Sequence, residues 1–265
     1  MRWLRYFSLG LLLLGSPWAD ARGQVQLPQV TTELRSPVDT VRVRAFYELL
    51  NTASAGVPRG GSLRPRVERL AEMARRNDEV LTGLIDLLHL ENSLGWTARP
   101  GLHPEAFSNY YGDLVGAVAA LGDERAIGSL IRVINTGWMA IEGLAALGER
   151  AVPEVLKVLD SPEGDHRRGA LLTLGRIAER AAQSGISGAR LSEIRSALVR
   201  VARDTDPWVR SSAIVALRPF GDDEVRQIVQ AIARTDPYSV MRGGVEVFPV
   251  RAAARAWLEE HPRRQ

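Results

Sequence analysis

The chain has 265 residues, of which 45% are hydrophobic, and its 34 basic and 31 acidic side chains give a formal net charge of +3. This balance is far from the strongly basic one of proteins that bind nucleic acids through phosphate contacts. The absence of cysteine excludes disulfide scaffolds, thiol catalysis, cysteine zinc sites and a lipid anchor attached to cysteine. We therefore expect a domain that is held together by its apolar core.

The first 21 residues have the order of a secretory signal peptide. Arg2 and Arg5 precede an apolar run over residues 6–14, and a helix-breaking Gly-Ser-Pro segment separates that run from a small-residue cleavage pattern at 19–21. The run is shorter than the ~20 residues that span a bilayer. We expect cleavage after this pattern and export to the periplasm or beyond, with an uncleaved N-terminal anchor as the alternative. No later stretch resembles a membrane span, so we expect no stable membrane insertion after cleavage.

The N-terminal part of the mature chain is predicted to be helical but irregular. Residues 22–36 form a polar, proline-containing lead-in. Residues 37–104 are predicted to hold degenerate helical repeats, because apolar residues recur at helical spacing from Pro37 onward. Within them, residues 91–104 contain two glycines and two prolines and are predicted to form an irregular loop.

A regular array is predicted from residue 105 to residue 260, followed by a tail at 261–265. Residues 125–134 and 150–159 repeat one helical pattern of residue types, and each copy follows a Leu-Gly pair that is typical of a glycine-capped helix end. The predicted antiparallel pairs are 123–134 with 138–147, 150–159 with 166–182, 191–203 with 207–219, and 223–234 with a C-terminal segment. Each pair leaves an apolar face that a neighbouring pair must bury. The expected fold class is therefore all-α, an α-solenoid of stacked antiparallel helix pairs.

A second recurring element stands at the turn inside the pairs. Asp206-Pro207-Trp208-Val209-Arg210 places an N-capping aspartate, a proline at the first helical position and an arginine about one turn later. Asp165-His166-Arg167-Arg168 is a looser version of the same motif.

With these motifs the chain resembles HEAT-repeat proteins, of the short-repeat type that is also found in phycobilisome-lyase subunits. The resemblance covers most of residues 105–260 and, more weakly, 37–90. In that family the turn aspartate and the following arginine form a ladder between adjacent repeats. The resemblance implies this structural role for Asp165 with Arg168 and for Asp206 with Arg210.

Aromatic side chains gather around the irregular loop, and they form the predicted partner-binding site. The cluster consists of Trp96, His103, Phe107, Tyr110 and Tyr111. Aromatic residues with polar tips are enriched at protein interfaces, and an irregular insertion in a regular array is a frequent place for function. The alternative is an ordinary core, since Phe107 and Tyr111 are four residues apart on one helix face.

The arginines of the predicted helices have two interpretations. They suit a groove for an anionic partner, or they belong to the structural ladder and to solvated helix faces, which the near-neutral charge favours. The residues concerned are Arg42, Arg44, Arg167, Arg168 and Arg210.

Metal and catalytic signals are weak. The four histidines show no ligand-like pairing with one another, and the nearest suggestive set is Asp86 with His89. No phosphate-binding glycine loop, dinucleotide fingerprint or Gly-x-Ser-x-Gly motif appears. We predict no cofactor, no metal and no catalytic residue. The alternating segment 241–250 is interpreted as a looped insertion before a closing helix, with an exposed partner-binding loop as the alternative.

Three functions compete at this point. The leading hypothesis is a non-catalytic interaction scaffold or adaptor, exported to the bacterial cell envelope, that binds a protein or peptide on the solenoid surface. The alternative is an enzyme subunit resembling the HEAT-like bilin lyases, whose array would hold a tetrapyrrole. A nucleic-acid enzyme resembling the HEAT-like alkylpurine glycosylases needs a basic groove, so net charge and export argue against a nucleic-acid partner.

Overall fold

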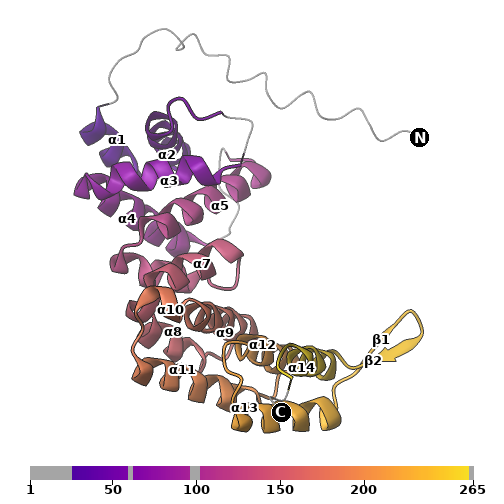
Figure 1. Cartoon of the computed structure of the whole chain (residues 1–265). Helices are drawn as coiled ribbons and strands as arrows, with labels where there is room; N and C mark the ends of the chain where they lie inside the picture. The colour runs from indigo at the N-terminus through magenta and orange to yellow at the C-terminus, as the bar shows by residue number, and fades with distance from the viewer. Residues whose placement is uncertain (1–25, 59–61, 96–101, 263–265) are drawn as a thin grey trace.

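The computed structural model describes residues 26–58, 62–95 and 102–262, and these residues form a curved stack of α-helices (Figure 1). The predicted signal peptide and Trp96 lie outside the described residues. The helices are α1 (Leu27–Glu33), α2 (Asp39–Ala53), α3 (Arg64–Arg75), α4 (Asp78–Leu94), α5 (Pro104–Leu121), α6 (Ile127–Arg132), α7 (Trp138–Leu147), α8 (Val152–Val158), α9 (Gly164–Glu179), α10 (Ala181–Ser184), α11 (Gly188–Val201), α12 (Pro207–Ala216), α13 (Asp223–Thr235) and α14 (Pro249–Glu260). Strands β1 (Val240–Arg242) and β2 (Val245–Val247) form a hairpin before α14.

The helices stack in two layers. One layer contains α4, α6, α8, α11 and α13, and the other contains α3, α5, α7, α9, α12 and α14. Figure 1 shows the second layer on the inner side of the bend, and we call it the inner layer. The predicted pairs appear as α6 with α7, α8 with α9, α11 with α12, and α13 with α14. The predicted fold class, an all-α solenoid of stacked helix pairs, is confirmed.

Local sequence signals set the helix ends. Asp206 accepts hydrogen bonds from the backbone N–H groups of Trp208 and Val209 at the start of α12, as an N-capping aspartate does. Gly122 ends α5 with φ 65° and ψ 25°, in the left-handed region that glycine adopts without strain. The Leu-Gly helix end predicted at this position is therefore confirmed.

Stacking is close because several helix contacts are made at glycine. A Cβ atom on Gly143 of α7 would lie 2.6 Å from Cβ of Ala119 on α5, and one on Gly175 of α9 would lie 2.9 Å from Cα of Ala216 on α12. The apolar side chains of the helices form one continuous core that extends from Val30 to Trp257. Such close packing fixes the register between neighbouring repeats. Val30 belongs to α1, so the prediction of a polar lead-in over residues 22–36 is wrong for residues 27–33, which form a helix packed on the core.

Helix α7 is shorter than its neighbours in the inner layer. Its second residue, Met139, lies beside Gly116, the thirteenth residue of α5. Its fifth residue, Glu142, pairs with Arg176, the thirteenth residue of α9, at 3.2 Å. Since the helices run in parallel, α7 begins about three turns later than α5 and about two turns later than α9. The inner layer consequently has a notch between the first halves of α5 and α9.

The segment predicted as a looped insertion is an antiparallel hairpin that extends from the end of the array (Figure 1). Val240 pairs with Val247 and Arg242 pairs with Val245. Met241 and Val245 are 67% and 63% exposed, so the hairpin adds little to the core. Among the described residues, no helix is both long enough and apolar enough to cross a membrane.

Candidate functional site

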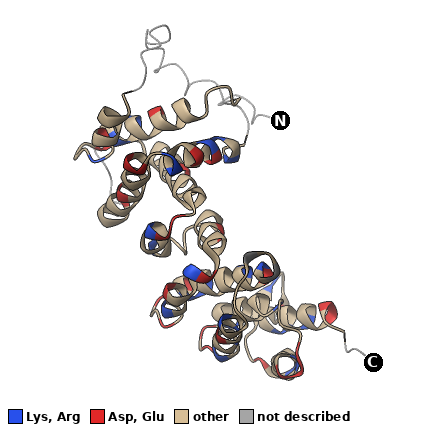
Figure 2. Ribbon diagram, turned by 60° about the vertical axis from the view of Figure 1, so that its left-hand side comes forward, with Lys and Arg blue, Asp and Glu red and all other residues tan. Residues whose placement is uncertain are grey.

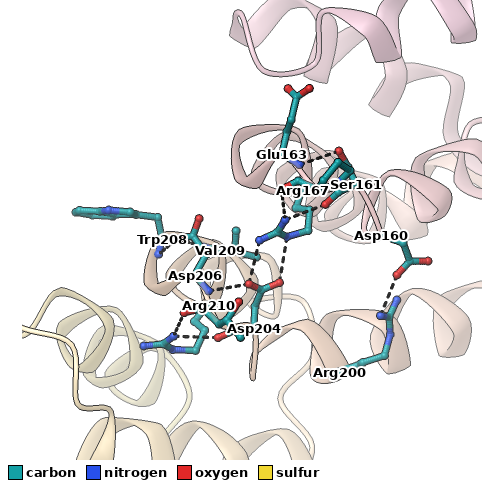
Figure 3. A network of polar contacts seen from close by, with 12 residues as sticks. Asp160, Ser161, Glu163, Arg167, Arg200, Asp204, Asp206, Trp208, Val209 and Arg210 are labelled. Atoms are coloured by element: carbon teal, nitrogen blue, oxygen red, sulfur yellow. Dashed lines mark hydrogen bonds and ion pairs between the residues drawn. The ribbon is translucent and has the colours of Figure 1, made fainter.

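Arginine–aspartate pairs connect successive repeats along one side of the array (Figure 3). Arg167 on α9 donates from Nε and Nη2 to the two carboxylate oxygens of Asp204, both at 3.1 Å. Arg210 on α12 donates in the same way to Asp236, at 2.7 and 3.0 Å. Each arginine also donates from Nη1 to the carbonyl oxygen six residues before it, at Ser161 and Asp204. These two-point pairs are the ladder between repeats.

The predicted ladder residues are therefore partly wrong. Arg210 belongs to the ladder, but its partner is Asp236, while Asp206 caps the start of α12. Asp165 and Arg168 pair with each other at 2.9 Å within α9, where their side chains are 72% and 43% exposed. Arg168 stands one position past the ladder arginine, and one residue rotates a side chain by about 100° around a helix.

A buried version of the same turn stands at the N-terminal end. Arg42 on α2 donates from Nη1 to the carbonyl oxygen of Ser36, six residues earlier, at 2.7 Å. Its Nε donates to Glu91 on α4 at 2.9 Å, and both side chains are 1% exposed. The phenol of Tyr110 donates to the same Glu91 oxygen at 3.1 Å. The hydrogen bonds compensate the cost of burying both charges.

All five arginines considered for an anionic groove have carboxylate partners. Arg44 pairs with Glu33 at 2.9 Å, and the other four make the pairs described above. Both signs of charge are interspersed along the helices (Figure 2). These contacts support the structural interpretation of the arginines.

The predicted aromatic cluster is largely part of the core. Tyr110 is fully buried, and Phe107 and Tyr111 are each 6% exposed. His103 is exposed at the start of α5, where its Nδ1 accepts a hydrogen bond from the backbone N–H of Glu105. The expectation of an exposed aromatic contact is wrong for the three helix residues, because α2 and α4 pack against this face of α5. Whether a partner binds near them stays a prediction.

Two of these aromatic residues line the notch left by the short α7. The notch holds a cavity of about 270 Å³. Among the described residues, those that line it are Glu91, Asn92, Gly95, Phe107, Tyr111, Arg132, Val133, Thr136 and His166. The first half of α5 gives one wall and the start of α9 the other, while the ends of α4 and α6 give the floor. The cavity therefore combines an aromatic wall with several polar side chains.

The inner layer carries two exposed tryptophans that the sequence analysis did not single out as site residues. Trp138 at the start of α7 is 50% exposed, and Arg176 of α9 lies over its ring at 4.7 Å. Trp208 at the start of α12 is 41% exposed and contacts the ring of Tyr238 edge-on, with 5.8 Å between ring centroids. Each tryptophan stands in the first turn of its helix, a position that by itself does not show in the sequence whether the side chain is exposed.

Acid–base and metal groups do not assemble into a recognisable centre in the described part of the chain. No group of three or more metal-ligating side chains occurs there. Asp86, which the sequence analysis set beside His89, pairs instead with Arg35 at 2.9 Å. Burial raises the pKa of the Tyr47 phenol and of the Asp113 carboxyl, which share a 3.1 Å hydrogen bond.

Residues 180–247 match the family model for HEAT repeats. The matched segment contains the Arg210–Asp236 pair. The chain folds as an α-solenoid of HEAT-like repeats.

Two solved structures are similar to the whole array. One is a computationally designed armadillo repeat protein for modular peptide recognition, with 17% identity and a TM-score of 0.47 over 89% of this chain and 100% of that one. The other is an engineered protein with 17% identity and a TM-score of 0.39 over 88% of this chain and 94% of that one. Among curated proteins none matches the chain.

Proposed function

We propose that the chain is a non-catalytic interaction scaffold that is exported to the bacterial cell envelope and binds a protein or peptide partner along the inner layer. The observation that carries this proposal is the exposure of Trp138 and Trp208, at 50% and 41%, on the two inner helices that flank α9. Tryptophan is one of the residue types enriched among side chains that dominate binding energy.

The fold itself does not need these two side chains to be exposed. The core is continuous without them, and Trp257 shows that the array can bury a tryptophan to 1% exposure. Between the two exposed rings, α9 presents the partly buried Leu172 and Arg176. An elongated partner that crosses α9 can cover both rings at once, which removes apolar area from water at two separated points.

In-cell crosslinking with tagged variants tests the proposal. The mature chain, the double variant Trp138→Ala/Trp208→Ala and the control Arg200→Ala are crosslinked in the native envelope, and the adducts are identified by mass spectrometry. Arg200 is a matched control because its side chain is 59% exposed on α11, in the outer layer. The proposal expects one discrete protein or peptide adduct that the control keeps and the double variant loses. An adduct pattern identical in all three proteins contradicts it.

Export is tested separately. The proposal expects full-length protein expressed in a bacterial host to be recovered from the periplasm or the medium with Arg22 as its first residue. Amino-terminal sequencing of the fractionated protein measures this. Cytoplasmic protein that begins at Met1 contradicts export and leaves the binding surface to be judged on its own test.

A further inference from the structure

We infer that the β1–β2 hairpin receives an extended segment of the partner as a third strand, which pairs with β1 and carries an acidic side chain toward Arg242. The inference rests on the proposed function, because the segment belongs to the partner that covers Trp208. It concerns a hairpin that extends from the end of the array, where Met241 and Val245 are 67% and 63% exposed (Figure 1).

The hairpin is ordered by its own turn. Gly243 and Gly244 connect the two strands with φ of 57° and 81°, which are the left-handed values of a type I′ turn. The twist of this turn type matches the right-handed twist of paired strands, so the turn favours two extended strands. Residues 241–246 are all exposed, and both strands therefore have an edge that is open to solvent.

The register determines which backbone groups point outward. Arg242 lies opposite Val245 beside the two-residue turn, and such a flanking pair is hydrogen-bonded within the hairpin. Hydrogen-bonded and non-hydrogen-bonded pairs alternate along an antiparallel ladder, so Met241 and Glu246 form the next, non-hydrogen-bonded pair. The N–H and C=O groups of Met241 therefore point away from β2, and neither bonds to another element that the structure describes. They provide a donor and an acceptor for an added strand, a known mode of peptide binding.

The charges of the hairpin favour the edge of β1 over that of β2. Arg242 and Glu246 are both exposed, and neither makes an ion pair with another residue that the structure describes. Opposite charges on neighbouring strands are stabilising, and like charges are destabilising. A segment with an acidic residue is therefore attracted to β1 by Arg242 and repelled from β2 by Glu246. Since the exposed Met241 side chain offers an apolar contact, the segment that fits has an apolar residue next to an acidic one.

The edge of β1 continues the surface that Trp208 marks. Tyr238, two residues before β1, contacts the Trp208 ring edge-on, with 5.8 Å between ring centroids. Phe248, directly after β2, instead lies under the Arg251 guanidinium of α14 at 4.1 Å. Strand β1 therefore starts beside the exposed tryptophan, whereas β2 leads into the last helix. A segment that covers Trp208 reaches Met241 within about 10 Å of extended chain, the length of the three residues from Tyr238 to Met241.

Selected peptides test the inference. A library of random dodecapeptides, about 40 Å long when extended, is selected on the mature protein, and the best binder is labelled for fluorescence anisotropy. Its affinity is measured for the mature protein, for Met241→Pro and for Met241→Leu, which keeps the N–H and an apolar side chain. Glu246→Pro is the matched control, because it removes the outward N–H from the edge of β2. Thermal unfolding of the variants checks that they remain folded.

The inference expects Met241→Pro to bind the peptide at least about tenfold more weakly than the mature protein, because the added strand loses a backbone hydrogen bond and meets the proline ring. Met241→Leu and Glu246→Pro should bind within about twofold of the mature protein. Replacing the acidic residue of the peptide by lysine should weaken binding to the mature protein and strengthen binding to Arg242→Glu. Equal binding to Met241→Pro and Glu246→Pro, or a selected peptide without an acidic residue, overturns the inference.

Failure of the inference and failure of the proposed function give different results. If Trp208→Ala loses the peptide and Met241→Pro keeps it, only the inference is overturned. If Met241→Pro loses the peptide and the double variant Trp138→Ala/Trp208→Ala keeps it, strand addition stands and the proposed inner surface is contradicted. A library without a binder contradicts both. Dimerisation in analytical ultracentrifugation that Met241→Pro abolishes, with no peptide bound at β1, assigns the edge to a second copy and overturns the inference.

Discussion

Arg210 and Asp236 form a two-point ion pair that ties one repeat to the next. Nε and Nη2 of the arginine lie 2.7 and 3.0 Å from the two aspartate oxygens, and the Asp236 side chain is only 4% exposed. Nη1 of the same arginine donates to the carbonyl oxygens of Asp204 and Thr205. One guanidinium therefore joins the turn before α12 to the turn after α13.

Arg210→Ala is expected to lower the free energy of unfolding by about 2–4 kcal/mol, because it leaves the buried Asp236 carboxylate without its cation. Urea unfolding followed by circular dichroism measures the change. Arg168→Ala is the matched control, since its pair with Asp165 is exposed, and it should cost no more than about 0.5 kcal/mol. Equal effects of the two substitutions would show that the ladder has been assigned to the wrong arginine.

Gly143→Ala is expected to destabilise the protein by about 1–3 kcal/mol, because the new methyl group would overlap Ala119 across the α5–α7 contact. Gly128→Ala is the counterpart in α6, where nothing lies within 4 Å of the added Cβ. There, alanine should stabilise by up to about 1 kcal/mol through its higher helix propensity. Thermal unfolding of both variants gives the comparison, and a destabilising Gly128→Ala would contradict the described environment.

Replacing a buried tryptophan by alanine is expected to lower the free energy of unfolding much more than replacing an exposed one. Trp257→Ala should cost about 3–5 kcal/mol because the ring fills the core under α14. Trp138→Ala should cost at most about 1 kcal/mol, the size of its lost contact with the Arg176 guanidinium. Chemical denaturation of each variant is the measurement. A large loss in Trp138→Ala would mean that its ring serves the fold and not a partner.

Stability is expected to fall in acid partly through Asp222. Arg195 donates to both oxygens of this carboxylate at 2.8 and 2.6 Å, which lowers its pKa to about 2 from an ordinary value of 3.8. Because the folded-state pKa lies below the unfolded one, the contribution is present above about pH 4 and is lost as the pH falls toward 2. Asp222→Asn keeps an N-capping residue and removes the charge.

The unfolding midpoint of Asp222→Asn should therefore depend less steeply on pH between about 4 and 2 than that of the parent chain. Asp165→Asn is the control, since its carboxylate is 72% exposed and pairs with an exposed arginine. Identical pH profiles for the parent and Asp222→Asn would contradict the assignment.

Local signals in the sequence were sufficient to predict the helices, but they were not sufficient to predict the register between neighbouring repeats. Caps such as Asp206 and Gly122 act within one turn, so the helix pairs follow from neighbouring residues. The choice between Arg167 and Arg168 depends on which side chain faces the next repeat. Arg167 and Arg210 each donate to the carbonyl oxygen six residues earlier, at Ser161 and Asp204. Aligning the two turns on these residues identifies Arg167 as the ladder arginine of α9.

The candidate site was harder to predict because its exposure results from stacking. Tyr110 looks like a contact residue in sequence, but α2 and α4 bury it through contacts that are 19 or more positions away. Trp138 looks like a core residue at a helix start, and it is exposed because α7 begins late relative to α5 and α9. Neither the burial of Tyr110 nor the exposure of Trp138 can be predicted from the sequence of one helix alone.

Site-specific photo-crosslinking tests the central claim, that the inner layer is the binding surface, most directly. A photoreactive amino acid is placed at position 138, 208 or 157 of the chain expressed in its own envelope, and adducts are resolved by mass after irradiation. The account predicts the same partner adduct from positions 138 and 208 and none from position 157 on the outer layer. An adduct from position 157 alone, or from no position, would contradict it.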